Sequence, residues 1–316
     1  MHRKTHLLAS LAAAALLAAC SGGNLNSLPA SQSPASPDGL RGPVNSAFIM
    51  RDDNGRMYPG THAMLTRERM HALAAHRRGS SNLNYYGGPV QTTPHIYVVY
   101  WGFNASGADP NGEQTRNTNF LSAVGGSQWL STVTQYYQSG PSYIQNNSGE
   151  LVSTWVDSTD SVPSSPTDAQ VAAEAVKLAQ HFGAYSENNS YVVATPHGHN
   201  TSGFATQWCA YHSTTSYGGT TIPYTNMPYM SDGGTSCGEN SVNSGSAGIL
   251  DGVTIVGGHE LAETQTDPGA GNGWLDSSGN EIGDKCAWVS LRNNSYSNGT
   301  YPNQPLWSNS ANGCVQ

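Results

Sequence analysis

Residues 95–195 constrain the fold more than any other part of the chain, because strand-like and helix-like patterns alternate there. Three segments are rich in β-branched and aromatic residues, as buried strands are: 95–101, 150–157 and 190–195. Between the last two, residues 165–168 offer N-capping side chains to a helix that extends from 169 to about 182 and ends at Gly183. This alternation predicts a parallel or mixed sheet covered by helices rather than an all-β sandwich.

Other segments extend this core. Apolar residues recur at helical spacing over 111–138 with a break at Gly125-Gly126, which predicts two short helices. Similar spacing over 61–78, with basic residues near the C-terminal end, predicts a surface helix. Residues 196–248 are rich in Gly, Ser, Thr and Asn, and the two prolines within 221–230 predict an edge strand or an ordered loop there.

The N-terminus has the composition of an export signal. Two basic residues precede an apolar run over 7–19, which is too short to span a bilayer comfortably and is followed by small residues. The run ends in Leu-Ala-Ala-Cys20, which resembles the bacterial lipobox, and this resemblance implies that Cys20 is lipidated. An ordinary signal peptide that contains a cysteine is the alternative. We therefore expect residues 1–19 to be a lipoprotein-type signal peptide on an exported protein, either an outer-membrane or cell-surface lipoprotein or a secreted one.

The segments after the signal differ in composition. Residues 20–43 contain few large apolar side chains and cannot bury enough surface to offset their chain entropy, which predicts a flexible tether. Residues 44–82 are expected to form a helical N-terminal segment, a candidate for removal as a pro-segment, ahead of a metallopeptidase-like domain over 83–316. The lipid anchor would be the only membrane attachment. The net charge of −8 argues against binding to nucleic acid.

Four cysteines remain when Cys20 is set aside, and four cysteines allow three pairings. Export favours their oxidation to disulfides. Pairing Cys209 with Cys237 and Cys286 with Cys314 would clamp two Gly- and Asn-rich segments that have little core of their own. Metal binding by the cysteines is the alternative, but the sequence contains no CxxC pair.

The motif with the most chemical content is His259-Glu-Leu-Ala-Glu263, which follows an apolar stretch that predicts a helix. This HExxE is the zincin motif HExxH with Glu in place of the second His. On a helix, His259 and Glu263 share one face and can both ligate one metal ion, while Glu260 can act as the general base. A solvated acidic helix face is the alternative interpretation.

Carboxylates downstream of this motif could complete the metal site. Glu281 and Asp284 lie in a short segment just before Cys286, and either could provide a third ligand. Turn formation near Gly279 and Gly283 explains the same residues without a metal. Zinc is the expected ion, since it accepts carboxylate oxygen as well as imidazole nitrogen.

A serine-hydrolase pattern competes with the metal site. Residues 234–238 match GxSxG, and Ser236, Asp251 and His259 follow the chain order of α/β-hydrolase triads. Neither a buried strand before Ser236 nor a helix after it is predicted, however, and Cys237 is expected in a disulfide.

Histidines and aromatic residues elsewhere offer further possibilities. His197, His199 and His212 are spare metal-ligand candidates, although a Gly- and Asn-rich loop also suits solvated imidazoles. Five aromatic residues could line a glycan- or peptide-binding groove or could belong to the core: Trp208, Tyr211, Trp274, Trp288 and Trp307.

Several segments together resemble the EXORDIUM-like, phosphate-induced protein family and its secreted bacterial relatives. They are Tyr85-Tyr-Gly-Gly-Pro-Val, Gly203-Phe204 leading to Cys209-Ala-Tyr-His212, His259-Glu-Leu-Ala-Glu with Asp267-Pro268, and Glu281-Ile-Gly-Asp-Lys-Cys286. The resemblance covers residues 83 to 314. It implies an extracellular protein whose bacterial versions look like metallopeptidases, although the family name alone does not imply catalysis.

We therefore expect an α+β protein with a zincin-like mixed sheet, an active-site helix and a loop-rich, disulfide-clamped C-terminal part. The expected function is that of an extracytoplasmic metal-dependent peptidase that acts on peptide or protein substrates. Its expected catalytic residue is Glu260 and its expected zinc ligands are His259, Glu263, Glu281 and Asp284. The alternative is a non-catalytic cell-surface lipoprotein of the EXORDIUM-like family that binds glycans or peptides.

Overall fold

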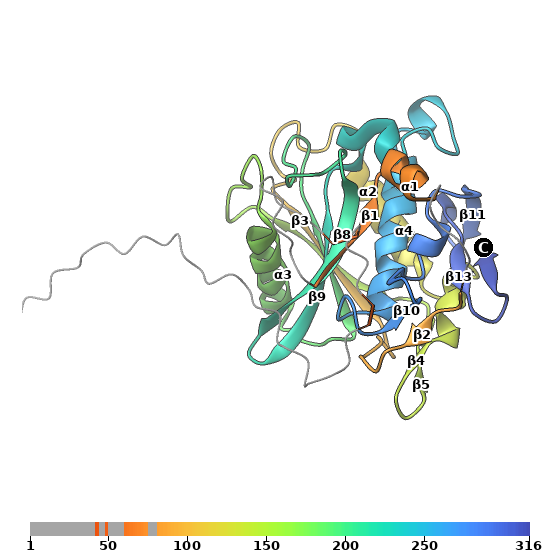
Figure 1. Cartoon of the computed structure of the whole chain (residues 1–316). Helices are drawn as coiled ribbons and strands as arrows, with labels where there is room; N and C mark the ends of the chain where they lie inside the picture. Colours follow the sequence, from red (N-terminus) through yellow and green to blue (C-terminus); the bar gives the residue numbers. More distant parts are fainter. Residues whose placement is uncertain (1–41, 44–47, 50–59, 75–80) are drawn as a thin grey trace, which may run out of the picture. The chain divides into compact units, whose positions relative to one another are not determined.

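A computed structural model describes residues 42–43, 48–49, 60–74 and 81–316 (Figure 1). The predicted signal peptide, Cys20 and most of the predicted tether lie outside the described residues. At the end of that tether, the N–H of Gly42 donates to the carbonyl oxygen of Gly271 at 3.0 Å. Within the described part, no helix combines the length and apolar character that a bilayer span requires.

A mixed sheet of six strands forms the centre of the fold. Its strands, in spatial order, are β1 (Thr61–Leu65), β8 (Trp208–Tyr217), β9 (Thr220–Met227), β7 (Asn189–Ala194), β3 (His95–Trp101) and β6 (Leu151–Asp157). Strands β9, β7, β3 and β6 run parallel to one another, whereas β8 is antiparallel to both β9 and β1. The three strands predicted from composition are β3, β6 and β7, and the predicted α+β class with a mixed sheet is confirmed.

Helices cover both faces of this sheet. Helix α3 (Asp168–Phe182) packs on one face, and helix α4 (Asp251–Thr266) with α2 (Glu113–Val124) packs on the other (Figure 1). As predicted, α3 begins at a capping box, in which Thr167 and Gln170 bond reciprocally, and ends at Gly183 with φ 60°. Residues 111–138 form two short helices, α2 and the 3₁₀ helix Leu130–Gln135, with the break at Gly125-Gly126.

The prediction for 221–230 was wrong in one respect, because β9 is an interior strand rather than an edge strand or a loop. Its pairing with β7 begins at Tyr224, so Pro223 lies in the part of β9 that pairs only with β8. A proline there removes no donor from the ladder between β9 and β7.

The helix predicted over 61–78 was wrong for its first residues. Thr61–Leu65 form strand β1, which pairs with β8 and is buried at all five residues. Helix α1 comprises only Arg67–Ala74. Pairing with β8 outweighs the helical spacing of the apolar residues, because all five residues of β1 gain burial from it. Part of the predicted N-terminal segment 44–82 therefore belongs to the main sheet.

Short hairpins and turns make up the rest of the fold. The two-stranded pairs are β2 (Asn84–Tyr85) with β10 (Trp274–Leu275), β4 (Tyr137–Gln138) with β5 (Ser142–Tyr143), β11 (Arg292–Tyr296) with β12 (Gly299–Asn303), and β13 (Leu306–Ser308) with β14 (Gly313–Val315). Further 3₁₀ helices are η2 (Met230–Cys237), η3 (Gly245–Ala247) and η4 (Asp284–Cys286).

Both predicted disulfides are present. The bond between Cys209 and Cys237 joins β8 to η2, and the bond between Cys286 and Cys314 joins η4 to β14. Each closes a separation of 28 residues, and cross-links of this kind stabilise a fold chiefly by restricting the unfolded chain. The C-terminal part is therefore clamped in the way the sequence predicted.

Candidate metal centre

Helix α4 lies in the core instead of on the surface. Every residue from Asp251 to Thr266 except Gly257 is buried, so the helix is covered by other parts of the protein on all sides. His259, Glu260 and Glu263 of the HExxE motif are each 0% exposed. The alternative of a solvated acidic helix face is therefore wrong, and the three side chains must find partners inside the protein.

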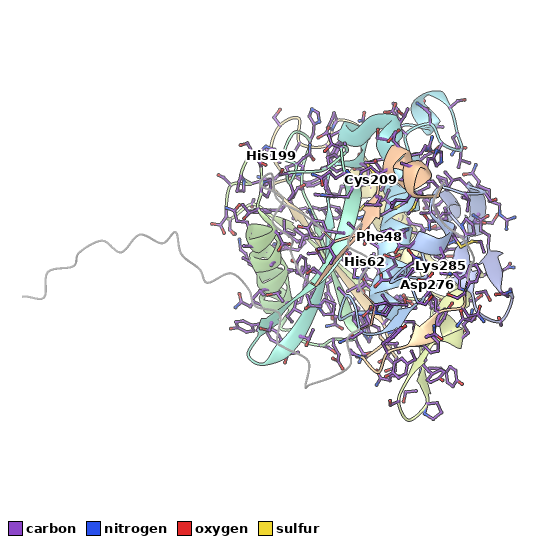
Figure 2. All side chains as sticks on the ribbon, viewed as in Figure 1. Phe48, His62, His199, Cys209, Asp276 and Lys285 are labelled. Atoms are coloured by element: carbon purple, nitrogen blue, oxygen red, sulfur yellow. A yellow bond between two sulfur atoms is a disulfide. The ribbon has the colours of Figure 1, made fainter. Side chains whose placement is uncertain are left out.

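Seven titratable side chains meet beside α4, and none is more than 6% exposed. They are His62 from β1, His212 from β8, His259, Glu260 and Glu263 from α4, and Glu281 and Asp284 from the segment that follows β10. We call them the α4 cluster. Figure 2 labels His62 beside Phe48, and their rings stack with centroids 5.1 Å apart.

The sheet directs the side chains of β8 to its two faces in alternation. His212 points toward α4, where it contacts Glu260, whereas the hydroxyl of its neighbour Tyr211 donates to Asp168 at the start of α3. Residues His62 and His212 are direct partners in the pairing of β1 with β8, so their rings share the α4 face.

His259, Glu263 and Asp284 form the part of the cluster that the motif predicted. The Nε2 atom of His259 is 3.0 Å from Oε1 of Glu263 and 3.9 Å from Oδ1 of Asp284. The backbone N–H of Asp284 also donates to Oε1 of Glu263 at 3.0 Å. A Cβ at position 283 would lie 2.7 Å from Nδ1 of His259, so only glycine lets this segment approach α4 so closely.

Glu260, the predicted general base, has both carboxylate oxygens engaged. The backbone N–H of Met64 in β1 donates to Oε1 at 3.1 Å, and Nδ1 of His212 lies 3.1 Å from Oε2. Burial raises the pKa of Glu260, while the hydrogen bond from His212 works in the opposite direction. The strand β1 therefore covers the residue that would accept a proton.

Glu281 lies between two imidazole rings. Its Oε1 is 3.6 Å from Nδ1 of His62, and its Oε2 is 3.4 Å from Nε2 of His212. Burial, together with the negative charges of Glu263, Asp267 and Asp284, raises the pKa of Glu281 well above its usual range.

The histidines and carboxylates of the cluster shift one another's pKa values. Burial lowers the pKa of His62, but Asp284, together with Glu263 and Asp267, raises it to about 9. Burial acts on His259 in the same way, and Glu263 raises the pKa of that ring to about 9. Burial raises the pKa of Glu263, but His259 and the other two histidines bring it down to about 2. Without a metal ion, protonated imidazoles supply the positive charge.

The cluster has the donors that a divalent metal ion requires. Three sets of residues have ligand atoms within 4.8 Å of one another, and Glu263 belongs to all of them: His259, Glu263 and Asp284; His62, Glu263 and Glu281; His212, Glu260 and Glu263. Among the described residues, Nδ1 of His259, Nε2 of His212 and Oε2 of Glu263 are buried without a hydrogen-bond partner. Imidazole and carboxylate donors with unused capacity fit zinc or a similar ion.

All five site residues predicted from the motif and its downstream segment lie in the α4 cluster. Of the spare histidines, only His212 joins them. His197 is 54% exposed and contacts Asp232, and His199 lies near the carbonyl of Pro163. His62 was missed because its segment was predicted to be helical, and no local pattern shows that it pairs with His212.

The serine-hydrolase pattern does not form a triad. Ser236 lies in η2 beside Cys237, which is in a disulfide. The carboxylate of Asp251 accepts hydrogen bonds from Val242 and Asn243, and His259 belongs to the α4 cluster.

The five aromatic residues considered for a binding groove belong to the core. The most exposed of them, Trp274 and Trp288, are 7% exposed. Of the two interpretations left open for these side chains, their burial favours the core over a binding groove.

Comparisons with protein-family models, curated proteins and solved structures find no match for this chain. The resemblance to the EXORDIUM-like family stays a prediction. The function is therefore argued from the α4 cluster itself.

Proposed function

We propose that this chain is an extracytoplasmic metal-dependent peptidase whose active site is the α4 cluster in a closed state. The observation that carries the proposal is the convergence of His259 and Glu263 with Asp284 in a buried set of ligand atoms, next to Glu260. The two disulfides support an extracytoplasmic location, since such bonds persist in oxidising compartments.

His259, Glu263 and Asp284 would hold the ion, with zinc as the expected metal. When bound, a divalent ion supplies a Lewis acid that polarises a peptide carbonyl and acidifies water. Glu260 would accept the proton of the attacking water and pass it to the leaving amine. Nδ1 of His212, 3.1 Å from Oε2 of Glu260, would orient this carboxylate for the transfer.

Access to Glu260 requires movement of β1. This strand covers Oε1 of Glu260 through the N–H of Met64, and the cluster is sealed in this arrangement. Because β1 is an edge strand, its release breaks the ladder with β8 and leaves the other four ladders of the sheet in place. An extended peptide could then pair with the freed edge of β8.

Elemental analysis and a peptide-cleavage assay on the purified exported protein test this proposal. We expect bound transition metal in wild type, its loss in His259→Ala, and its retention without hydrolysis in Glu260→Gln. His95→Ala is the matched control, since His95 is exposed at the start of β3, outside the cluster. Equal metal content in wild type and His259→Ala would overturn the proposed site.

A second candidate is a non-catalytic cell-surface protein that binds glycans or peptides and uses the cluster for stability. The observation in its favour is that both oxygens of Glu260 are engaged and the cluster is sealed. Bound metal without hydrolysis, even after β1 has been released from β8, would support this candidate over the peptidase.

A further inference from the structure

The two histidines that flank Glu281 each have one nitrogen fixed as a donor. Nδ1 of His212 lies 3.1 Å from Oε2 of Glu260, and Nε2 of His62 lies 2.7 Å from Oδ2 of Asp284. When Glu260 and Asp284 are ionised, their carboxylates only accept hydrogen bonds, so these two nitrogens then carry the protons. In the neutral rings, the remaining nitrogens are lone-pair acceptors.

Both lone pairs are directed at Glu281. Nδ1 of His62 is 3.6 Å from one of its oxygens, and Nε2 of His212 is 3.4 Å from the other. Nε2 of His212 makes no hydrogen bond within the described part of the chain. Acceptors that face acceptors in a buried site repel one another unless a proton or a metal ion lies between them, and one divalent ion would satisfy both imidazoles and Glu281 at once. A carboxylate that orients a histidine from behind is also the usual support of a metal-ligating imidazole.

Glu263 lies between the two histidines that flank Glu281 and the ligand set formed by His259, Glu263 and Asp284. Glu263 offers a carboxylate oxygen within 4.8 Å of ligand atoms of His62 and Glu281, and it also offers one within 4.8 Å of ligand atoms of His259 and Asp284. Its Oε1 faces His259, while its Oε2 has no hydrogen-bond partner among the described residues. A carboxylate in this position can bridge two metal ions about 3.5–4 Å apart.

One more carboxylate lies close to this second place. Asp267 is buried beside Glu281, and its negative charge contributes to the raised pKa of Glu281. The oxygens of Asp267 accept the backbone N–H groups of residues 271–273, so this side chain is not assigned as a ligand.

We propose that the α4 cluster binds two divalent cations that share Glu263, the second of them held by Glu281, His62 and His212. This inference rests on the metal-binding part of the proposed function and is independent of peptide hydrolysis. It assigns Glu281 to a different ion from Asp284, and it makes His62 of β1 a metal ligand. Glu260 stays outside both ligand sets and orients His212.

Counting ions tests the proposal directly. We load the purified protein with Zn²⁺, remove excess ion by dialysis, and measure zinc per chain. Wild type and the control His95→Gln are expected to hold two ions, and His62→Gln and Glu281→Gln to hold one, with second-site affinity at least about 100-fold lower. Circular dichroism checks that each variant is folded, and the two variants lie on different elements in case one is not.

Electron paramagnetic resonance of the Mn²⁺-loaded protein gives a second measurement that needs no variant. Two ions bridged by Glu263 are expected to give a spin-coupled spectrum, which becomes that of isolated Mn²⁺ in Glu281→Gln. One ion per wild-type chain, or two ions in both folded variants, would overturn the inference. One ion with hydrolysis would leave the proposed function standing, two ions without hydrolysis would leave only this inference, and no ion would overturn both.

Discussion

Two groups of carboxylates, on opposite sides of the sheet, obtain their positive charge in different ways. On the α3 side, Lys177 contacts Asp157 and Asp160 and lies 3.9 Å from Glu174. On the α4 side, no Lys or Arg forms an ion pair with the cluster among the described residues. The first group contains a permanent cation, whereas the described partners of the second are imidazoles, whose charge depends on bound protons. This difference separates a structural ion pair from a candidate site.

The largest expected effect comes from removing one charge in each group. Glu263→Gln should lower zinc affinity by more than about 100-fold, because Glu263 belongs to every ligand set in the cluster. Glu174→Gln is the matched control and should leave zinc affinity unchanged, since Lys177 serves that group. Isothermal titration with Zn²⁺ measures both variants, and equal affinities would remove the contrast between the two sides.

A reversible lock on β1 tests whether the α4 side must open. Thr61 and Ser213 are direct partners across β1 and β8, so Thr61→Cys with Ser213→Cys can form a disulfide there. We expect peptide hydrolysis to be at least about tenfold lower in the oxidised double variant than in its reduced form. Wild type in the same reductant controls for the native disulfides. Equal rates of hydrolysis in the oxidised and reduced forms would show that β1 does not have to move for substrate to bind.

The pH dependence of stability provides a third test. The pKa values of His62 and His259 rise from 6.5 to about 9, so the folded, metal-free protein binds more protons than the unfolded chain between those pH values. Its free energy of unfolding should therefore be highest below about pH 6.5 and fall as pH rises toward 9. Buried Glu281, whose pKa is also raised, acts with the same sign.

Thermal unfolding of the metal-free protein at several pH values measures this slope. His62→Gln should reduce it, because one of the two histidines is gone. Saturation with zinc should reduce the fall in stability as pH rises, since the ion takes the place of the protons and binds more tightly as the ligands deprotonate. A metal-free protein that becomes more stable from pH 6.5 to 9 would contradict the charge assignment.

The smallest effect is expected at a histidine outside both groups. His197 is 54% exposed and contacts Asp232 in a loop. His197→Ala should change the free energy of unfolding by at most about 1 kcal/mol, as is usual for exposed pairs, and leave zinc binding intact. Urea unfolding and metal analysis check the two parts. A loss of zinc in this variant would mean that the site extends beyond the α4 cluster.

Short patterns in the sequence predicted helices α3 and α4, but they predicted only some of the residues in the α4 cluster. Thr167 and Gly183 mark the ends of α3 because capping depends on neighbouring residues, and the HExxE spacing placed three cluster residues on one helix. His62 could not be found in this way. It lies 222 residues from Asp284, and its place depends on the register between β1 and β8, which no short pattern encodes.

Burial was equally hidden from the sequence. The acidic residues of α4 suit a solvated face as well as a metal site, and only the packing of strands, loops and Gly283 against the helix decides between them. The aromatic residues posed the same question, since Trp208 and Tyr211 suit either a groove or the core by composition, and the structure places both in the core.

The disulfide between Cys286 and Cys314 has a consequence for the order of maturation. It fixes η4, which begins at Asp284, so the carboxylates of Glu281 and Asp284 are held against α4 by a bond that forms only under oxidising conditions. A newly made chain in a reducing compartment lacks this constraint. For the proposed exported metal-binding protein, thiol oxidation should therefore precede metal loading, and a complete site would form only after the chain has left the compartment in which it was synthesised.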